Sequence, residues 1–318
     1  MFLHPSLRNT IVNHSNVLTD NSKCSIYAGF DPTAPDLHIG HLSVLSVLKV
    51  FAERGHHVFL LVGDSTAKIG DPSFRSSLRT PQARDDLALK FEENLTNLFK
   101  KLLTKECQFT VLRNSKWHTR TSIVQFMEEI ATHIKVSDLI KRDSIKERLS
   151  NGMNFAELTY PLLQAYDFVH LYKKYNCKLQ IGGNDQWGNI TTGTEIINRL
   201  HGDESALGLT IGLLSSEDGK KMGKSSKNAT WLTGMRSSPI SVVQALENLP
   251  KNELFEYAFD NKNTTEAIAA KIYDGKQLTN ERGDFRPMLG AHITKANGHF
   301  GFQFHTVILW KRGFESIT

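Results

Sequence analysis

Two polar segments of this chain combine residue types that could bind a nucleotide. The first runs from Tyr27 to His41 and contains Gly29, Asp31, Thr33, His38 and Gly40. An apolar run ends at Phe30 and a helical pattern begins near Gly40, and in an open α/β sheet ligands bind at such a turn. A helix N-terminus there offers free N–H groups to a phosphate.

His38 and His41 are three residues apart, so we expect both to face the same ligand. An isolated His-x-x-His pair is usually two surface histidines, but this placement favours a binding role.

The second segment, residues 218–227, is rich in lysine. It reads Asp-Gly-Lys-Lys-Met-Gly-Lys-Ser-Ser-Lys and includes Lys221, Lys224 and Ser225. A lysine run alone is usually a solvated surface loop. Its two glycines are typical of a loop that closes and reopens during turnover. Together with the first segment, it favours a cationic loop that reaches a phosphate.

A third set of polar residues lies at helical spacing. Tyr160, Gln164 and Asp167 stand at i, i+4 and i+7, so one helix face presents all three. Such a stripe is often a polar outer face. Here Leu162 and Phe168 belong to the same apolar helix, which predicts a buried one. A buried aspartate without a cation needs a hydrogen-bond donor, and we expect a ligand to supply it.

Two further segments complete the candidate site. Gln180-Ile181-Gly182-Gly183 leads through Asp185 and Gln186 into a helical pattern, and its glycines let backbone approach a ligand closely. A Gly-Gly turn alone is more often structural. Arg75 and Arg79 follow Gly70-Asp71-Pro72-Ser73; exposed arginines are usually only solvated.

Six separated blocks give the chain a family resemblance. His38-Ile39-Gly40-His41 resembles the HIGH signature of class I aminoacyl-tRNA synthetases, and residues 221–225 resemble their KMSKS signature. About 180 residues separate the two motifs. Residues 27–33, 70–73, 160–168 and 180–190 then resemble tyrosyl-tRNA synthetases of the bacterial and organellar type. The resemblance covers about residues 25–235.

The resemblance implies a role for each candidate residue. The tyrosine site would comprise Tyr27, Asp71, Tyr160, Gln164, Asp167 and Gln180. Asp167 and Tyr27 would bind the substrate hydroxyl, and Asp71, Tyr160 and Gln164 the α-ammonium. The ATP site would comprise Gly29, Asp31, Gly40, Gly183, Asp185, Gln186 and Ser225. The groups acting on the transferring phosphate would be Thr33, His38, His41, Arg75, Arg79, Lys221 and Lys224.

The family chemistry implied has two steps. The carboxylate of L-tyrosine attacks the α-phosphorus of ATP and pyrophosphate leaves; a terminal ribose hydroxyl of tRNA(Tyr) then attacks the adenylate. The carboxylate is already a nucleophile, so the first step needs no general base. Catalysis then reduces to positioning and charge stabilisation. Mg²⁺ would arrive with ATP, and we expect no metal site in the protein. The family also implies a homodimer, with helices near residues 120–150 as the contact surface.

Several departures from the family pattern qualify the resemblance. Ala28 stands where many relatives have Cys, so we expect one ribose contact to be missing. Phe74-Arg75 replaces a common Gly-Lys, and Gly223 replaces a Ser. Relatives continue into a longer helical domain and a basic S4-like RNA-binding domain. The S4-like part has no match here, so we expect adenylate synthesis to be retained and tRNA affinity to be weaker.

The elements that must position these residues alternate between strand and helix. Strands are predicted at 25–30, 57–62, 109–112, 178–181 and 209–213, and helices at 40–54, 84–103, 122–134, 137–149, 161–175 and 185–200. This alternation predicts a doubly wound, Rossmann-like parallel α/β sheet followed by a small α-helical domain. The predicted organisation begins with an N-terminal extension (1–24) and a catalytic domain (25–233) that contains inserted helices (about 115–155). A partial helical domain (234–280) follows, with helices at 241–249, 253–259 and 264–273. The chain is expected to end in an irregular tail (281–318).

Composition excludes several other classes of protein. The 318 residues are 40% hydrophobic and 22% charged, which is typical of a globular protein. The longest apolar run, Val58–Val62, is far shorter than the ~20 residues of a membrane span. Three scattered cysteines argue against a disulfide scaffold or a zinc module. A net charge of +5 fits a polyanionic partner, and an acid-free stretch over residues 1–19 favours the mitochondrial matrix over a bacterial cytoplasm.

Two other functions remain open at this stage. One is an RNA-binding or splicing-helper protein on a synthetase fold, which the intact lysine segment and pocket disfavour. The other is a different HIGH-type nucleotidyltransferase, which the Tyr27 and Asp167 pair disfavours.

Overall fold

The computed structural model describes most of the chain between residues 10 and 304. The described residues are 10–14, 23–73, 85–201, 206–212, 214, 229–233, 236–249, 253–259, 264–273, 291–296 and 299–304.

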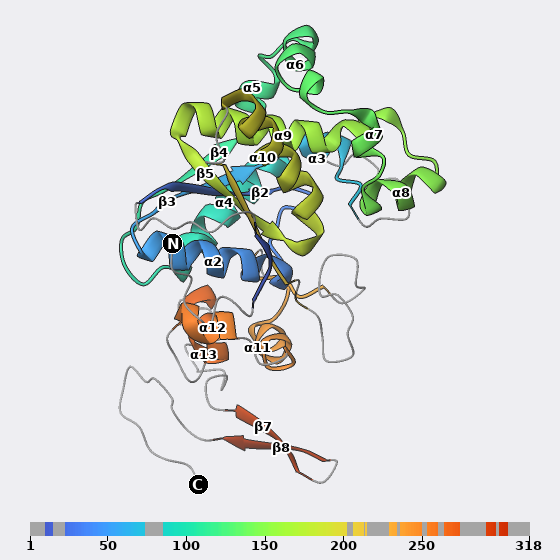
Figure 1. The fold of residues 1–318 in the computed structure, drawn as a ribbon. Helices are drawn as coiled ribbons and strands as arrows, with labels where there is room; N and C mark the ends of the chain where they lie inside the picture. Colours follow the sequence, from blue (N-terminus) through green and yellow to red (C-terminus); the bar gives the residue numbers. More distant parts are fainter. Residues whose placement is uncertain are drawn as a thin grey trace.

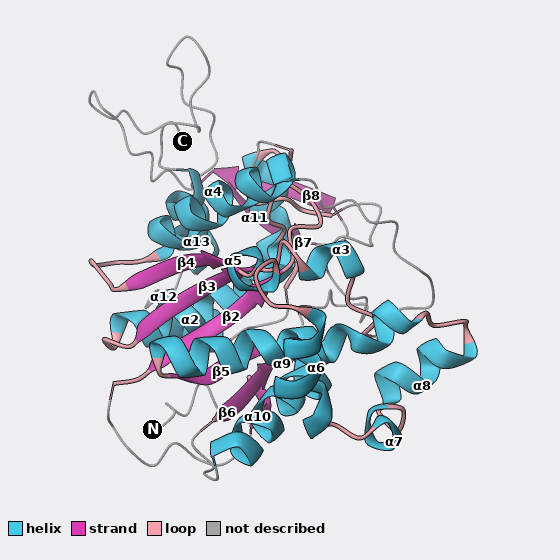
Figure 2. Ribbon diagram, turned by 90° about the horizontal axis from the view of Figure 1, so that it is seen from above, coloured by secondary structure: helices cyan, strands magenta, loops and turns pink. Residues whose placement is uncertain are grey.

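A mixed six-stranded sheet forms the centre of the molecule (Figures 1 and 2). Its order is β1-β6-β5-β2-β3-β4, and neighbouring strands are parallel except for the antiparallel pair β1–β6. The strands are β1 (Ile11–His14), β2 (Ser25–Phe30), β3 (His57–Val62), β4 (Phe109–Arg113), β5 (Cys177–Gly183) and β6 (Leu207–Ile211). Strands β3 and β4 extend the sheet on one side of β2, and β5 and β6 on the other. The carboxyl ends of β2 and β5 therefore flank the topological switch point, where open α/β sheets bind ligands. The expected fold class is confirmed.

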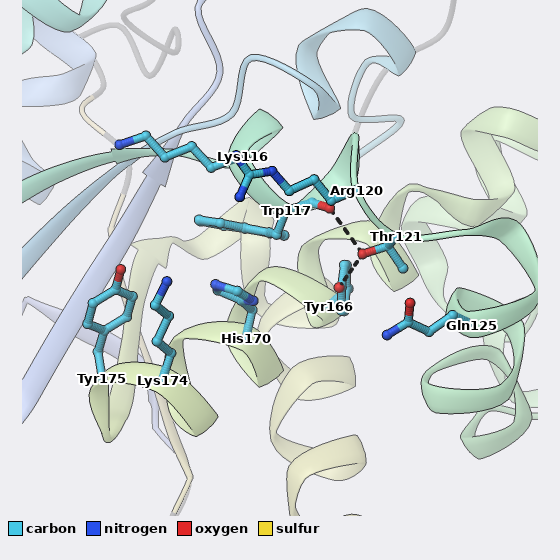
Figure 3. Close-up of a pocket in the computed structure, with 9 residues that line it drawn as sticks. All are labelled: Lys116, Trp117, Arg120, Thr121, Gln125, Tyr166, His170, Lys174 and Tyr175. Carbon is cyan, nitrogen blue, oxygen red and sulfur yellow. Dashed lines mark hydrogen bonds between the residues drawn. The ribbon is translucent and has the colours of Figure 1, made fainter.

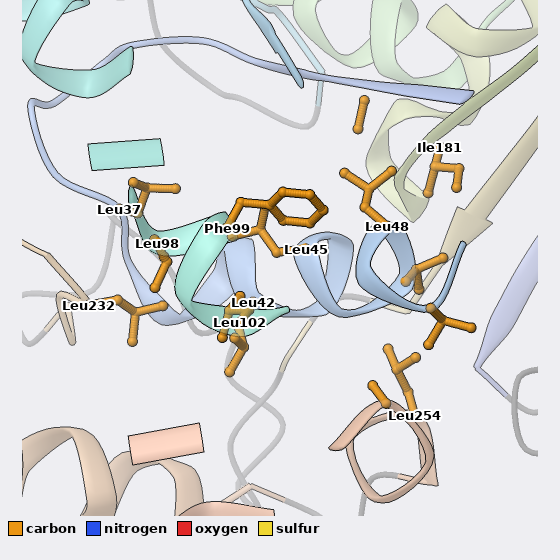
Figure 4. Packing of buried hydrophobic residues seen from close by; sticks show 14 of the residues in the cluster. Leu37, Leu42, Leu45, Leu48, Leu98, Phe99, Leu102, Ile181, Leu232 and Leu254 are labelled. Carbon is orange, nitrogen blue, oxygen red and sulfur yellow. The ribbon is translucent and has the colours of Figure 1, made fainter. Parts of the chain in front are cut away.

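The sheet is covered by helices on both faces because its strands are apolar on both faces. One face packs on α2 (Leu42–Glu53) and α4 (Asp85–Leu102), with Leu45, Leu48 and Phe99 at the contact (Figure 4). The other face packs on α9 (Phe155–Tyr175) and α10 (Trp187–His201). Neighbouring β2 residues point to opposite faces, so Ile26 joins the α2 layer and Tyr27 the α9 layer.

Shorter helices connect and extend these layers. A 3-10 turn, η1 (Ile39–His41), leads into α2, and η3 (Asn184–Gln186) leads into α10. The others are α3 (Thr66–Ile69), α5 (Ser115–His118), α6 (Ile123–Glu129), η2 (Ala131–His133), α7 (Val136–Leu139), α8 (Asp143–Ser150), α11 (Pro239–Glu247), α12 (Glu253–Phe259) and α13 (Thr264–Tyr273). Of the last three, α12 packs on α2, where Lys49 Nζ donates to the carbonyl of Ala258 at 2.5 Å, while α13 packs on α4 and α11 packs on α13.

Helix α9 begins earlier than the sequence predicted. It starts at Phe155, and Pro161 lies in its interior, so the predicted start at residue 161 is wrong. A reciprocal cap sets the true start: Glu157 N–H donates to Asn154 Oδ1, and Asn154 N–H donates to Glu157 Oε2. Glu157 also pairs with Arg148 of α8 at 3.2 Å, and both side chains are buried. The earlier start places Tyr160 firmly within the helix.

Two segments that lie outside the predicted catalytic and helical domains also contain strands. Residues 11–14, expected in an N-terminal extension, form β1 at the sheet edge; four residues give too short a pattern to detect. The irregular tail expected from residue 281 is wrong over 291–304, where β7 (Ala291–Ala296) pairs with β8 (His299–Phe304). Asn297-Gly298 between the two strands is a hairpin signal that the glycine-rich composition of this region obscured. The other domain boundaries remain predictions.

The buried Arg148–Glu157 pair gives a stability prediction. Substitution Glu157→Ala should lower the free energy of unfolding by about 3–5 kcal/mol, because it leaves a buried guanidinium uncompensated and removes the side-chain half of the α9 capping box. Urea denaturation measures this loss. Glu93→Ala is the matched control: it breaks the exposed Lys90–Glu93 pair and should cost under about 1 kcal/mol. Equal losses in the two variants would contradict the account.

Candidate active site

Three hydrogen-bond donors reach the carboxylate of Asp167 at the switch point. Trp117 Nε1 donates to Asp167 Oδ1 at 2.8 Å, His118 Nε2 lies 2.7 Å from the same oxygen, and Asn114 Nδ2 donates to Oδ2 at 3.1 Å. Asp167 is 3% exposed. The sequence argument that a ligand must supply its donor is therefore wrong, because Asn114, directly after β4, and two residues of α5 supply three.

Two polar groups beside Asp167 have no hydrogen-bond partner within the described part of the chain. They are the Tyr27 hydroxyl and Gln180 Oε1, both fully buried. Tyr27 and Gln180 are paired across β2 and β5. Burial raises the pKa of Tyr27 well above its usual value, and the charge of Asp167 raises it further. An unpaired buried polar group costs roughly 1–3 kcal/mol, so this arrangement suits a ligand with a donor and an acceptor.

Asp31, directly after β2, connects that strand to α3 and α9 through two hydrogen bonds. Its Oδ1 accepts from Thr66 Oγ1 at 2.8 Å, and its Oδ2 accepts from the Tyr160 hydroxyl at 2.7 Å. A Cβ on Gly63 would lie 2.1 Å from Asp31 Oδ1, so only glycine fits there. Burial raises the pKa of Tyr160 well above its usual value, and Asp31 and Asp71 raise it further.

A second polar cluster surrounds Asp71. Gln186 Nε2 donates to Asp71 Oδ2 at 2.6 Å, and the Ser73 N–H donates to Oδ1 at 2.9 Å. Asn189 Nδ2 lies 3.4 Å from Asp71 Oδ1 and 3.1 Å from Gln164 Oε1. The fold thus brings together Asp71, Gln164 and Gln186, which lie in three separate segments of the sequence.

The two histidines of the first segment interact directly. His38 Nδ1 accepts from the Gly40 N–H, and His41 Nδ1 accepts from the His38 N–H, both at 3.1 Å. Their rings stack with centroids 3.9 Å apart, and His41 also packs near Phe30 and Phe91. Burial lowers the pKa of His41 well below its usual value, and the neighbouring His38 lowers it further. The lowered pKa favours the neutral form of His41.

The segment after the lysine-rich stretch is tied to His38. The Ile39 N–H donates to the carbonyl of Thr230, the Leu232 N–H donates to that of Leu37, and the Trp231 ring meets His38 edge-on at 5.9 Å. Lys221, Lys224 and Ser225 lie outside the described residues, as do Arg75 and Arg79. Residues 230–232, which follow the lysine-rich segment, nevertheless lie beside His38, at the end of the site where we expect the nucleotide.

The remaining candidates lie at the carboxyl ends of β2 and β5. Gly29 is exposed, and a Cβ added there would meet nothing within 4 Å. Thr33 follows on the same loop, where its N–H donates to the Asp31 carbonyl. Gly183 ends β5, and Asp185 lies in η3. The backbone at the switch point therefore borders open space next to Gly29.

Sequence reasoning missed four residues of these clusters: Asn114, Trp117, His118 and Asn189. Asn114 directly follows the carboxyl end of β4, and that position could have marked it. Asn189 lies three residues after Gln186 on the same helical face. Trp117 and His118 carried no local signal.

The described residues contain no group of three or more His, Cys, Asp or Glu side chains able to hold a metal ion. Among the helices described, none is long and apolar enough to span a membrane.

A sequence profile of the class I tRNA synthetases (W and Y) matches residues 19–285. The chain belongs to this family. It is 40% identical over 241 residues to a tyrosine–tRNA ligase of Staphylococcus haemolyticus, covering 76% of this chain and 57% of that protein. It is 37% identical over 260 residues to tyrosine–tRNA ligase 1 of Enterococcus faecalis, covering 80% and 62%.

Solved structures of the same family have this fold. A C-terminally truncated mitochondrial tyrosyl-tRNA synthetase of Aspergillus nidulans is similar with a TM-score of 0.65 and 26% identity, covering 79% of this synthetase-family chain and 80% of that one. The truncated mitochondrial enzyme of Coccidioides posadasii gives a TM-score of 0.66 at 23% identity, covering 84% and 86%. The chain spans about three fifths of the length of the curated relatives it matches.

Proposed function

We propose that this chain is a tyrosine–tRNA ligase. It activates L-tyrosine with ATP to tyrosyl-adenylate and pyrophosphate, then transfers tyrosine to the 3′-terminal ribose of tRNA(Tyr). The observation that carries the proposal is the buried Asp167 carboxylate near the Tyr27 hydroxyl, which, like Gln180 Oε1 on the neighbouring strand, has no partner among the described residues. The tyrosine–tRNA ligase names of the relatives support the same substrate.

The geometry around Asp167 suits a phenol. A substrate hydroxyl donates to Asp167 and accepts from the Tyr27 hydroxyl, which satisfies the orphaned donor. Gln180, paired with Tyr27 across two strands, lines the same site. Phenylalanine would leave these groups unpaired, so the site selects against it.

The Asp71 cluster suits the α-ammonium group. Asp71 supplies the negative charge, and Gln164 and the Tyr160 hydroxyl supply further oxygens. Tyr160 stays protonated because its pKa is raised, so its oxygen is a neutral acceptor. Gln186 and Asn189 hold the Asp71 carboxylate in place.

The ATP site lies at the carboxyl ends of β2 and β5. His38 and Gly40 at the start of η1 face the phosphates, and Gly29 leaves room for the nucleotide against the backbone. Gly183, Asp185 and Gln186 lie where the ribose binds. Mg²⁺ enters as the ATP complex and neutralises phosphate charge.

Positioning and charge account for the activation step. The tyrosine carboxylate attacks the α-phosphorus, and pyrophosphate leaves with the electron pair of the broken P–O bond. Thr33, His38, Arg75, Arg79, Lys221 and Lys224 stabilise the charge that develops on the phosphates. Contacts that strengthen only in the transition state raise the rate of this step. His41 accepts from the His38 N–H and packs near Phe30 and Phe91, so it fixes the His38 loop.

We propose the mitochondrial matrix as the compartment. The acid-free stretch over residues 1–19 and the likeness to mitochondrial enzymes of two fungi support it. The curated relatives are bacterial and favour the alternative, a bacterial cytoplasm.

We also propose a homodimer formed through the helices inserted after β4. Large apolar side chains there are exposed: Ile123 (78%), Val124 (66%), Val136 (65%) and Phe155 (70%). In Figure 1, α6, α7 and α8 extend along one side of the molecule, away from α11–α13. An exposed apolar surface of this kind is typical of a protein–protein contact.

Pyrophosphate exchange tests the activity. The protein should catalyse tyrosine-dependent exchange between ATP and pyrophosphate. Asp167→Ala should remove it through loss of substrate binding, and His38→Ala should lower it by about a hundredfold through loss of a phosphate contact. Thermal unfolding serves as the control for folding. Absence of exchange in folded wild-type protein would contradict the proposal. RNA binding that persists in Asp167→Ala, together with absence of tRNA charging by the folded wild type, would favour the splicing-helper alternative.

Sedimentation velocity tests the dimer. The wild type should sediment as a dimer, and Ile123→Asp should shift it to monomer because a charge enters the apolar contact. Leu89→Asp is the matched control, since Leu89 is 57% exposed on α4, outside the proposed surface. A monomeric wild type would refute the proposed contact.

A further inference from the structure

His118 contacts the centre of the tyrosine site, although no sequence signal marked it. Its Nε2 lies 2.7 Å from Asp167 Oδ1, and its side chain is 10% exposed. A deprotonated carboxylate only accepts hydrogen bonds, so the His118 Nε2 atom must carry a hydrogen.

The donors are divided unequally between the two oxygens of Asp167. Oδ1 receives both Trp117 and His118, whereas Oδ2 receives Asn114 alone among the described residues. Each carboxylate oxygen has about two acceptor positions. Oδ1 is therefore full, and a single acceptor position is left on Oδ2.

The ring of His118 is itself held in place. It meets the Tyr166 ring edge-on at 5.3 Å, and the Tyr166 hydroxyl is hydrogen-bonded to Thr121 at 2.6 Å. Trp117 lies flat against His170, with ring centroids 4.3 Å apart (Figure 3). These contacts therefore hold Trp117 and His118, the two donors to Oδ1, on the side of α9 that faces α5.

We propose that His118 is a specificity-positioning residue for tyrosine. By filling Oδ1 together with Trp117, it stops rotation of the carboxylate and leaves one acceptor, on Oδ2, for the substrate hydroxyl. Without His118, Oδ1 regains an open position, and the broad terminal torsion of Asp167 lets either oxygen turn toward the ligand. This inference rests on the proposed function and adds a residue to the hydroxyl-recognition site.

A set of His118 variants tests the proposal. In His118→Leu the donor is absent, in His118→Asn the amide is too short to reach Asp167, and in His118→Gln an amide N–H lies near the former Nε2 position. Leu and Asn should raise the tyrosine KM of pyrophosphate exchange by on the order of tenfold to a hundredfold. They should also lower the preference for tyrosine over phenylalanine, and leave the ATP KM within about twofold. Gln should restore most of the tyrosine KM.

His201→Leu is the control, because it removes a histidine ring that packs beside Tyr172 rather than beside a donor to Asp167. It should leave the tyrosine KM within about threefold. Thermal unfolding of each variant identifies any that fails to fold, and the Asn variant then replaces Leu.

Calorimetric titration with L-tyrosine separates this inference from the proposed function. Unchanged tyrosine affinity and KM in both His118→Leu and His118→Asn would overturn the positioning role. Tyrosine binding without exchange in the wild type would overturn the ligase activity alone, and no tyrosine binding by the wild type would overturn both.

Discussion

A buried carboxylate needs hydrogen-bond donors, and in this protein that requirement organises the whole site. Asp167 draws its donors from Asn114, Trp117 and His118, and so fixes the end of β4 and all of α5 against α9. Asn114 also donates to Thr66, Thr66 donates to Asp31, and Asp31 accepts from Tyr160. Tyr160 and Asp167 lie on the same helix, so the hydrogen bonds form a closed circuit that begins and ends on α9. Asp167 and the end of β2 are thereby held as one unit.

This circuit explains why small residues are required around it. Gly63 leaves the space in which Asp31 and Thr66 meet. Gly193 lets α10 approach α9, since a Cβ there would lie 2.9 Å from the Phe168 ring. The Asp71 cluster, carried by η3 and α10, is then placed beside the circuit through Gln164. Donor and acceptor groups for a phenol, a cation and a nucleotide thus lie along the carboxyl edge of one sheet.

The sequence predicted the parts of this arrangement that depend on local pattern. The apolar runs at 25–30 and 57–62 are β2 and β3, because strands buried on both faces read as continuous hydrophobic stretches. The spacing of Tyr160, Gln164 and Asp167 correctly indicated one helix. The donors Trp117 and His118 could not be predicted, because they lie about 50 residues from Asp167 and meet it only through the packing of α5 on α9. The start of α9 was missed because Pro161 resembles a first-turn proline, while the Asn154–Glu157 cap set the boundary.

The central claim is that Asp167 presents one acceptor for a substrate hydroxyl beside the Tyr27 hydroxyl. Calorimetric titration of the wild-type protein with L-tyrosine and with L-phenylalanine tests it most directly, because the two ligands differ only in that hydroxyl. The account predicts that tyrosine binds at least about a hundredfold more tightly, since phenylalanine leaves buried polar groups unpaired. Equal affinity for the two amino acids would contradict it.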